Sequence, residues 1–135
     1  MIKQIIVMRK DLNMRKGKMI AQGAHASMKV FFDKMIRPGK LVMHDTKAVD
    51  ARILQLTAEE LEWVDGKFTK ICVSVDSEQE LLDIHTKAKD AGLNCALIQD
   101  AGLTEFDGVP TYTCCAIGPN DSEEIDPITK DLKLL

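Results

Sequence analysis

Several signatures that would assign a protein to a common class are missing from this sequence of 135 residues. No apolar run approaches the ~20 residues of a membrane-spanning helix. The four cysteines lack C-x-x-C spacing, which favours reduced thiols over disulfides or a zinc site. A strand pattern begins at the second residue, which predicts that no cleaved leader is present. We therefore expect a cytoplasmic protein with no membrane association.

Signatures of metal, nucleotide and covalent chemistry are missing as well. The three histidines, His25, His44 and His85, lie far apart without ligand spacing, so we expect no metal and no cofactor. The pair Gly17-Lys18 lacks the upstream glycine and the following hydroxyl of a P-loop. Neither a G-x-S-x-G motif nor a Cys/His nucleophile signature occurs. Any hydrolysis would then proceed by direct attack of water.

What the sequence does have is an uneven distribution of charge. The net charge is −3, yet residues 1–40 hold ten Lys or Arg against two acidic residues, a local charge of +8 that leaves −11 for the rest. If the fold gathers these cations on one face, a nucleic-acid backbone is the expected partner. A solvated basic helix explains the same charges, and charge alone leaves both interpretations open.

The hydrophobic pattern predicts alternating strands and helices in one domain, residues 1–135. Apolar or alternating runs predict strands over 2–8, 68–75, 94–99 and 111–117. Periodicity and terminal signals predict helices over 18–35, 57–65, 77–91 and from 121 or 122 onward. Thr57 with Glu60, and Ser77 with Glu80, each have capping-box spacing. This order predicts an α/β layered domain on a mixed sheet.

The first predicted helix carries three stripes at ~100° per residue. The apolar stripe, which we expect to be buried, consists of Ile20, Ala24, Met28, Phe31 and Met35. The polar ridge, which we expect to stay open, consists of Lys18, Gln22, His25 and Lys29. A flank of mostly small residues lies between them and would allow another backbone to approach; it consists of Met19, Gly23, Ala26 and Val30.

Two charged residues are placed where α/β proteins hold ligands. Lys18 follows a glycine at a predicted helix N-terminus, where it would bind a phosphate or a developing oxyanion; the alternative is a solvated helix cation. Asp100 directly follows a buried strand, and ligands collect beyond the carboxyl ends of strands. The alternative is a turn former ahead of Ala101-Gly102.

Three further residues could support chemistry at the same place. The pKa of a free histidine, ~6.5, suits proton transfer by His25, although a lone histidine is more often structural. Thr104 and Thr113 would donate hydrogen bonds to a substrate, or serve as ordinary loop and strand residues.

These residues fall within a longer pattern. The motif R-x-D-L-x-M-x-x-G-K-x-x-A-Q-x-x-H-A occupies residues 9–26, and further blocks lie at 97–102, 116–119 and 131–135. In this pattern the chain resembles the type 2 peptidyl-tRNA hydrolases, the archaeal and eukaryotic-type family. The resemblance covers about residues 3–36 and 67–135.

The resemblance implies a fold, an activity and an assembly. The fold would be a three-layer α/β/α sandwich on a four-stranded mixed sheet, and the protein would be a cytosolic homodimer. It would hydrolyse the ester between a peptide and the 3′-ribose of tRNA without a metal. The functional positions of the family fall on Lys18, Gln22, Asp100, Thr104 and Thr113, with His25 nearby.

A mechanism follows as a hypothesis. Asp100 would accept a hydrogen bond from the attacking water, as general base or through a relay, and Lys18 would stabilise the oxyanion or a terminal phosphate. Gln22 and Thr113 would orient the ester end of the substrate, and Thr104 would brace Asp100 or the water. The tRNA acceptor arm would lie over a set of basic residues, namely Lys10, Arg15, Lys16 and Lys29.

Two features depart from the family pattern. Glu105 stands where the family typically has glutamine, which adds negative charge beside an RNA site. Residues 37–65 form a connecting segment that is longer than usual and atypical. These departures favour an alternative function, a non-catalytic tRNA-, RNA- or partner-binding module on the same scaffold. A third, weaker alternative is a small phosphate-ligand protein that uses the Gly17-Lys18 corner.

Overall fold

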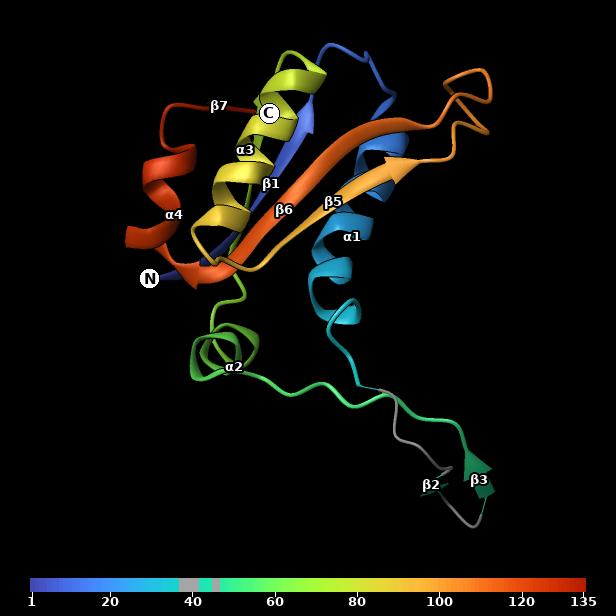
Figure 1. The fold of residues 1–135 in the computed structure, drawn as a ribbon, viewed down its shortest axis with the longest axis vertical. Helices are drawn as coiled ribbons and strands as arrows, with labels where there is room; N and C mark the ends of the chain where they lie inside the picture. Colours follow the sequence, from blue (N-terminus) through green and yellow to red (C-terminus); the bar gives the residue numbers. More distant parts are fainter. Residues whose placement is uncertain (37–41, 45–46) are drawn as a thin grey trace.

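The computed structural model describes residues 1–36, 42–44 and 47–135. Figure 1 shows the elements, which in chain order are β1 (Ile2–Arg9), α1 (Lys16–Phe32), β2 (Val42–His44), β3 (Lys47–Val49), α2 (Ala58–Asp65), β4 (Lys70–Val75), α3 (Glu78–Asp90), β5 (Cys95–Asp100), β6 (Thr111–Asp121), α4 (Ser122–Thr129) and β7 (Lys133–Leu134). The main sheet has the order β5-β6-β1-β4-β7. Among the described residues, β1 and β4 are the one parallel pair of this sheet and its other neighbours are antiparallel, which confirms the predicted mixed sheet.

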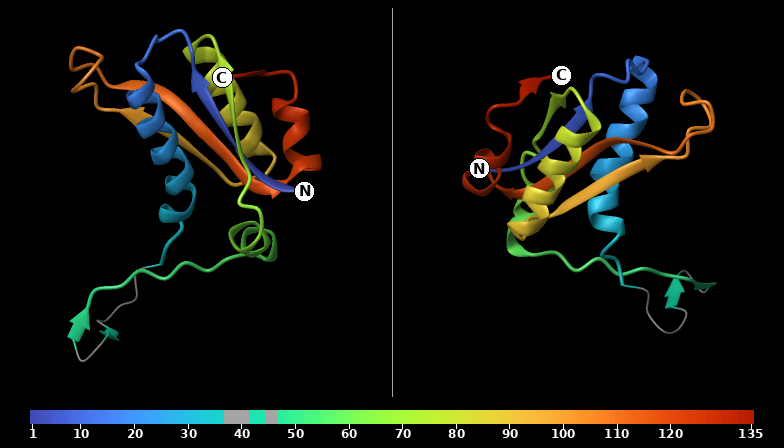
Figure 2. Two further views of the ribbon diagram at one scale, coloured as in Figure 1. Left: turned by 180° about the vertical axis from the view of Figure 1, so that it is seen from behind. Right: turned by 45° about the horizontal axis from the view of Figure 1, so that its top comes forward.

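The two central strands divide the core into two layers. Val7 on β1 pairs with Cys115 on β6, and both side chains are buried against α3 and α4. The next pair, Met8 and Cys114, points to the opposite face and is buried in the cluster beneath α1. Side chains alternate across a strand, so one pair of strands serves both clusters. Helices therefore cover both faces of the sheet (Figure 2), which confirms the predicted layered α/β domain.

Local capping signals are largely confirmed. Thr57 caps α2 with a full capping box, because its side chain accepts from Glu60 N while the Glu60 carboxylate accepts from Thr57 N. Ser77 caps α3 by accepting from Glu80 N. The Glu80 carboxylate instead accepts from the backbone of Asp76, so this second box is incomplete.

The strand count differs from the prediction. The sheet has five strands rather than four, because Leu134 of β7 pairs with Val73 on the far edge of β4. A strand of two exposed residues has no alternation that could be recognised in a sequence. The β2–β3 hairpin, which lies away from the main sheet, was not predicted either (Figure 1). Residues 37–40, whose sequence Arg-Pro-Gly-Lys predicts a break after the first helix, lie outside the described residues.

Helix α1 packs through a different face from the one predicted. Its buried residues are Gln22, Gly23, Ala26 and Val30. Ile20 and Met28 of the apolar stripe are 73% and 51% exposed. The flank of mostly small residues packs on the sheet instead, because it lets the helix approach closely. A Cβ at Gly23 would lie 3.9 Å from side-chain atoms of Ile6 and Met8. Ile20 and Met28 are left exposed at the side of the helix.

Candidate active site

The candidate site lies at the edge of the sheet where β1 and β5 end and helix α1 begins (Figure 1). β6 runs antiparallel to both strands, so their carboxyl ends share this edge. Arg9, the last residue of β1, fixes the turn that follows. Its guanidinium donates to Asp11 at 2.6 and 3.1 Å and to the backbone carbonyl of Tyr112 at 3.0 Å. The segment leading into α1 is thereby tied to β6.

The centre of the site is an ion pair between helix α1 and strand β5. Lys18 Nζ donates to Asp100 Oδ1 at 3.0 Å and to Thr104 Oγ1 at 2.8 Å. The Lys18 and Asp100 side chains are only 13% and 14% exposed. A largely buried pair is less screened by water than a surface pair. Lys18 is therefore a held charge and not a solvated helix cation.

Asp100 is both a turn former and a member of this pair. Its Oδ2 accepts from the backbone N–H of Gly102, two residues along the chain, at 2.9 Å. Its Oδ1 accepts from Lys18 and, at 3.1 Å, from Gln22 Nε2. The two interpretations of Asp100 left open by the sequence are thus compatible.

Gln22 connects Asp100 to the interior of the protein. Its side chain donates to Asp100, and its Oε1 accepts from the Thr113 hydroxyl at 2.6 Å. The direction of this chain is fixed, because a reversed Gln22 amide would place its oxygen against the Asp100 carboxylate. Gln22 is 1% exposed and Thr113 is fully buried. The prediction that Gln22 stays on an open ridge is therefore wrong, and both residues lie behind Asp100.

The surrounding groups decide the protonation of Asp100. Burial alone would raise the pKa of this carboxyl, but hydrogen bonds from Lys18 and Gly102, together with the charge of Lys18, lower it below its ordinary value. Asp100 is consequently a carboxylate at neutral pH, paired with an ammonium.

The Asp100 carboxyl should therefore titrate below the ~3.9 of an unperturbed aspartate. Because the native pKa is depressed, the pair contributes stability that is present above the unfolded-state pKa and is lost as the pH falls through the native pKa. Carbon-13 NMR of the carboxyl measures this directly. In Lys18→Met the midpoint should move upward, and an unchanged midpoint would show that Lys18 is not the cause.

A second prediction concerns the link between Thr113 and Gln22. Thr113→Val keeps the shape but leaves the buried Gln22 oxygen without its donor, which should cost about 1–3 kcal/mol of unfolding free energy. The Gln22 amide would still be oriented by its hydrogen bond to Asp100, so the loss falls on its oxygen. Thr113→Ser, which keeps the hydroxyl, is the matched control. Urea unfolding of the three proteins tests this, and equal stability of Thr113→Val and wild type would contradict it.

The loop after β5 supplies contacts that the sequence did not indicate. The ring centroid of Phe106 lies 5.6 Å from Lys18 Nζ. Glu105, 20% exposed, has its carboxylate 3.9 Å from Arg15 Nε. The Gly102 N–H is the donor that the turn-former interpretation of Asp100 implied. The loop is thus joined to the start of α1 by several contacts.

The remaining predicted residues lie outside this network. His25 is exposed, and among the described residues it makes none of the hydrogen bonds of the Lys18–Asp100 network. Lys10, Arg15 and Lys16 are exposed around the start of α1. Lys29 is exposed farther along the helix and pairs with Asp33 at 2.9 Å.

A largely buried Lys–Asp pair at the carboxyl end of a strand lies where α/β enzymes commonly hold their ligands. The chain belongs to the family Peptidyl-tRNA hydrolase PTH2, whose sequence model matches residues 2–135. This confirms the family that the motif indicated.

Curated relatives agree with this assignment. The peptidyl-tRNA hydrolase of Methanocaldococcus jannaschii is 42% identical over 134 residues, which cover 99% of this chain and 100% of the relative. That of Methanothermobacter thermautotrophicus is 40% identical with the same coverage. The peptidyl-tRNA hydrolase of Sulfolobus acidocaldarius is 37% identical, again over 99% of this chain and 100% of the relative.

A solved structure shares the fold. A protein of unknown function from Agrobacterium tumefaciens strain C58 superposes with a TM-score of 0.53 at 12% identity, over 98% of this chain and 96% of that chain. The likeness concerns the fold alone. Across the described residues, none of the helices combines the length and apolarity that crossing a membrane requires.

Proposed function

We propose that this protein hydrolyses the ester bond of peptidyl-tRNA, releasing peptide and tRNA, by metal-independent attack of water. The observation that carries the proposal is the Lys18–Asp100 pair, which is largely buried and lies beside exposed cations at the start of α1. Membership of the PTH2 family supports the same activity.

Lys18 has the capacity to stabilise the oxyanion of this reaction. An ammonium group has three N–H donors. Among the described residues, Lys18 Nζ donates to Asp100 and Thr104, which leaves a third donor for the substrate. When water adds to the ester carbon, the carbonyl oxygen gains negative charge. A fixed cation that is shielded from water stabilises that charge more than it stabilises the neutral ester.

Asp100 has one acceptor position left for the attacking water. A carboxylate accepts at about four positions. Within the described part of the chain, Lys18 and Gln22 occupy Oδ1, and Gly102 N occupies one side of Oδ2. A water bound at the other side of Oδ2 would be oriented for attack. Because the pKa of Asp100 is lowered, it is a weak base, and its main roles are to orient the water and to balance the charge that develops on it.

The atoms of the reaction balance without a cofactor. The water oxygen bonds to the ester carbon, and its proton passes through Asp100 or a second water. The tetrahedral intermediate then collapses, the bond to the ribose 3′ oxygen breaks, and that oxygen takes up the proton. Gln22 and Thr113 are buried, so in this proposal they position Asp100 and do not contact the ester.

The tRNA would bind across the exposed cations. Lys10, Arg15 and Lys16 lie at the start of α1, beside the site, and would contact phosphates of the acceptor arm. Lys29 lies ~20 Å from Lys16 along the helix, at 1.5 Å per residue, and would contact a more distant phosphate. Such contacts carry no sequence information and make binding dependent on salt.

The alternative, a non-catalytic binding module, was favoured by Glu105 and the atypical segment 37–65. The carboxylate of Glu105 faces Arg15, so a cation opposes its charge. The segment 37–65 was predicted to differ from the usual connection of the family. Residues 37–41 and 45–46 of this segment lie outside the described residues. Release of labelled peptide from purified N-acetyl-aminoacyl-tRNA separates the two functions. Turnover is expected, and intact tRNA binding without turnover would favour the module.

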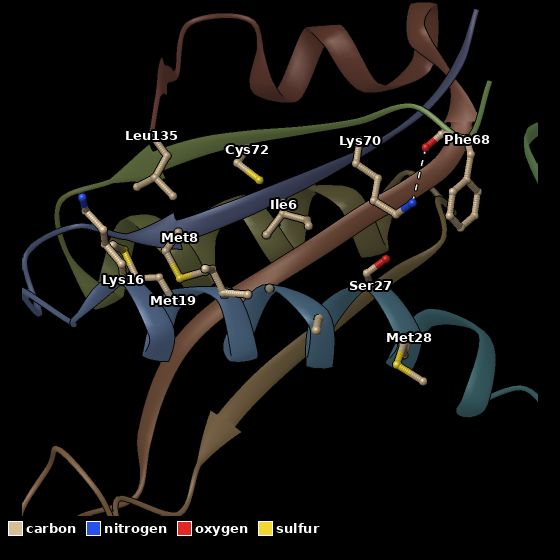
Figure 3. Close-up of a pocket in the computed structure, with 13 residues that line it drawn as sticks. Ile6, Met8, Lys16, Met19, Ser27, Met28, Phe68, Lys70, Cys72 and Leu135 are labelled. Carbon is tan, nitrogen blue, oxygen red and sulfur yellow. Dashed lines mark hydrogen bonds between the residues drawn. The ribbon is translucent and has the colours of Figure 1, made fainter.

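We also propose that the protein is cytoplasmic and acts as a homodimer. The dimer proposal is supported by a groove of about 690 Å³ between helix α1 and the β1–β4 part of the sheet (Figure 3). Leu135 lies at one end of this groove and Phe68 at the other. Ile20 and Met28, the exposed part of the apolar stripe, line it as well. A large apolar surface of this kind marks an interaction site.

The expected oligomeric state can be tested on the same helix. Ile20→Lys places a charge in the groove and should convert the dimer to a monomer in sedimentation velocity. Lys130→Met, an exposed change on α4's C-cap, should leave the dimer intact. A wild-type monomer at micromolar concentration would contradict the proposal.

A further inference from the structure

The loop between β5 and β6 exposes apolar side chains beside the candidate active site. Leu103 is 86% exposed, more than any other large hydrophobic residue of the described chain, and Val109 is 59% exposed. Scattered apolar side chains on a surface are common and need no explanation. These two differ because their loop is closed by its own hydrogen bonds and is joined through Thr104 to Lys18.

The loop is closed by its own backbone. Gly108 N donates to Gly102 O at 2.8 Å, and Val109 N donates to Phe106 O at 2.9 Å. Gly102 has φ +81°, and a Cβ there would lie 2.3 Å from Val109 O, so the two ends of the loop cross closely. Leu103 and Val109 therefore leave the backbone from neighbouring points. Because the backbone of the loop is already closed, a ligand that contacts these side chains does not have to order the loop itself.

The position of the loop relates Leu103 to the substrate. The next residue, Thr104, accepts from Lys18 Nζ, so Leu103 is adjacent to the residue that braces the reacting end. Glu105, one residue farther, contacts Arg15 among the cations assigned to phosphates. The loop thus extends from the scissile ester towards the RNA and lies on the nucleic-acid side of the site.

We propose that Leu103, with Val109 beside it, forms the platform on which the 3′-terminal adenine of the tRNA stacks. This specificity contact rests on the proposed function. Every tRNA ends in adenosine, and its base is attached to the same ribose that bears the ester. An apolar side chain packs on the face of an unstacked base. The side chain of the esterified amino acid differs between substrates, whereas the adenine is constant, and a single fixed platform suits the constant group.

The test compares two substrates and a few variants. N-acetyl-leucyl-tRNA is prepared with adenosine or with an abasic ribose at its 3′ end, and kcat/KM is measured for each. Leu103→Ser should lower kcat/KM about tenfold relative to wild type on the adenosine substrate. On the abasic substrate, Leu103→Ser and wild type should have equal kcat/KM. Leu103→Met, which stays apolar, should keep most of the rate. Leu61→Ser, a 48% exposed leucine on α2, is the matched control and should behave as wild type.

Each outcome decides between the possibilities. Equal rates for wild type and Leu103→Ser on the adenosine substrate would overturn the platform alone, and so would an equal loss on the abasic substrate. A loss seen with N-acetyl-leucyl-tRNA but absent with N-acetyl-glycyl-tRNA would reassign Leu103 to the amino-acid side chain. Absence of turnover by wild type would instead overturn the proposed function, and the platform with it.

Discussion

Asp100→Asn should lower kcat for peptidyl-tRNA hydrolysis about 100- to 1,000-fold. The asparagine can still accept from Gly102 N, so the turn after β5 should survive. It cannot carry the negative charge that balances Lys18 and the attacking water. The amide also presents N–H donors where Lys18 and Gln22 donate, which expels one of them.

Asp107→Asn is the matched control for this substitution. Asp107 is an exposed acid in the same loop, and its positive φ of +50° is a conformation that asparagine tolerates. The variant Asp107→Asn should hydrolyse peptidyl-tRNA at the wild-type rate. Single-turnover measurements, which separate chemistry from product release, are the appropriate assay. Asp100→Asn with near wild-type single-turnover rates would remove Asp100 from the mechanism.

Lys18→Met should have an effect of similar size on kcat, about 100- to 1,000-fold. Methionine approximates the length of the lysine side chain without its charge or donors. The substrate oxyanion would lose its cation, and the Asp100 carboxylate would be left largely buried without its ion-pair partner. Lys18→Arg keeps the charge, but the donors of a planar guanidinium point in other directions than the three donors of the ammonium. This variant should therefore keep only part of the rate.

Lys16→Met distinguishes the two kinds of cation at this site. Lys16 is exposed and is assigned to a phosphate, so its loss should raise KM and flatten the salt dependence with little change in kcat. Lys18→Met should instead lower kcat. The double variant Lys18→Met/Asp100→Asn should be little worse than either single variant, because the two residues act as a unit. Additive losses would contradict a shared role.

The components of the site were predictable, but their burial was not. The position of Lys18 after Gly17 at a helix start, and of Asp100 after a strand, identified the two ends of the ion pair from local patterns. Neither pattern contains the register of the sheet, which brings residues 82 positions apart to 3.0 Å. Gln22 shows the limit of prediction from local sequence patterns. Its helical spacing from Lys18 predicted a shared ridge, yet the ridge turns inward at Gln22 because Asp100 and Thr113 lie there to bond it.

The face of α1 that packs on the sheet likewise could not be predicted from the sequence. Two stripes of this helix are apolar or small, and hydrophobicity alone favours the one with Ile20 and Met28. Close packing favours the other, because Gly23 and Ala26 let the helix lie directly on Ile6 and Met8. Strand β1, with seven buried residues in a row, and the capped helices were predictable because their signals are local.

Helix α1 also separates the Lys18–Asp100 site from the segment that leads to α2. Lys18 and Gln22 lie in its first turns, whereas the chain leaves its far end at Phe32, ~15 Å beyond Gln22. The stretch before Ala58 can therefore lengthen without moving Lys18 or Asp100. The same spacing makes that stretch a natural insertion point for an affinity tag or a fluorescent reporter in a hydrolase that keeps its turnover.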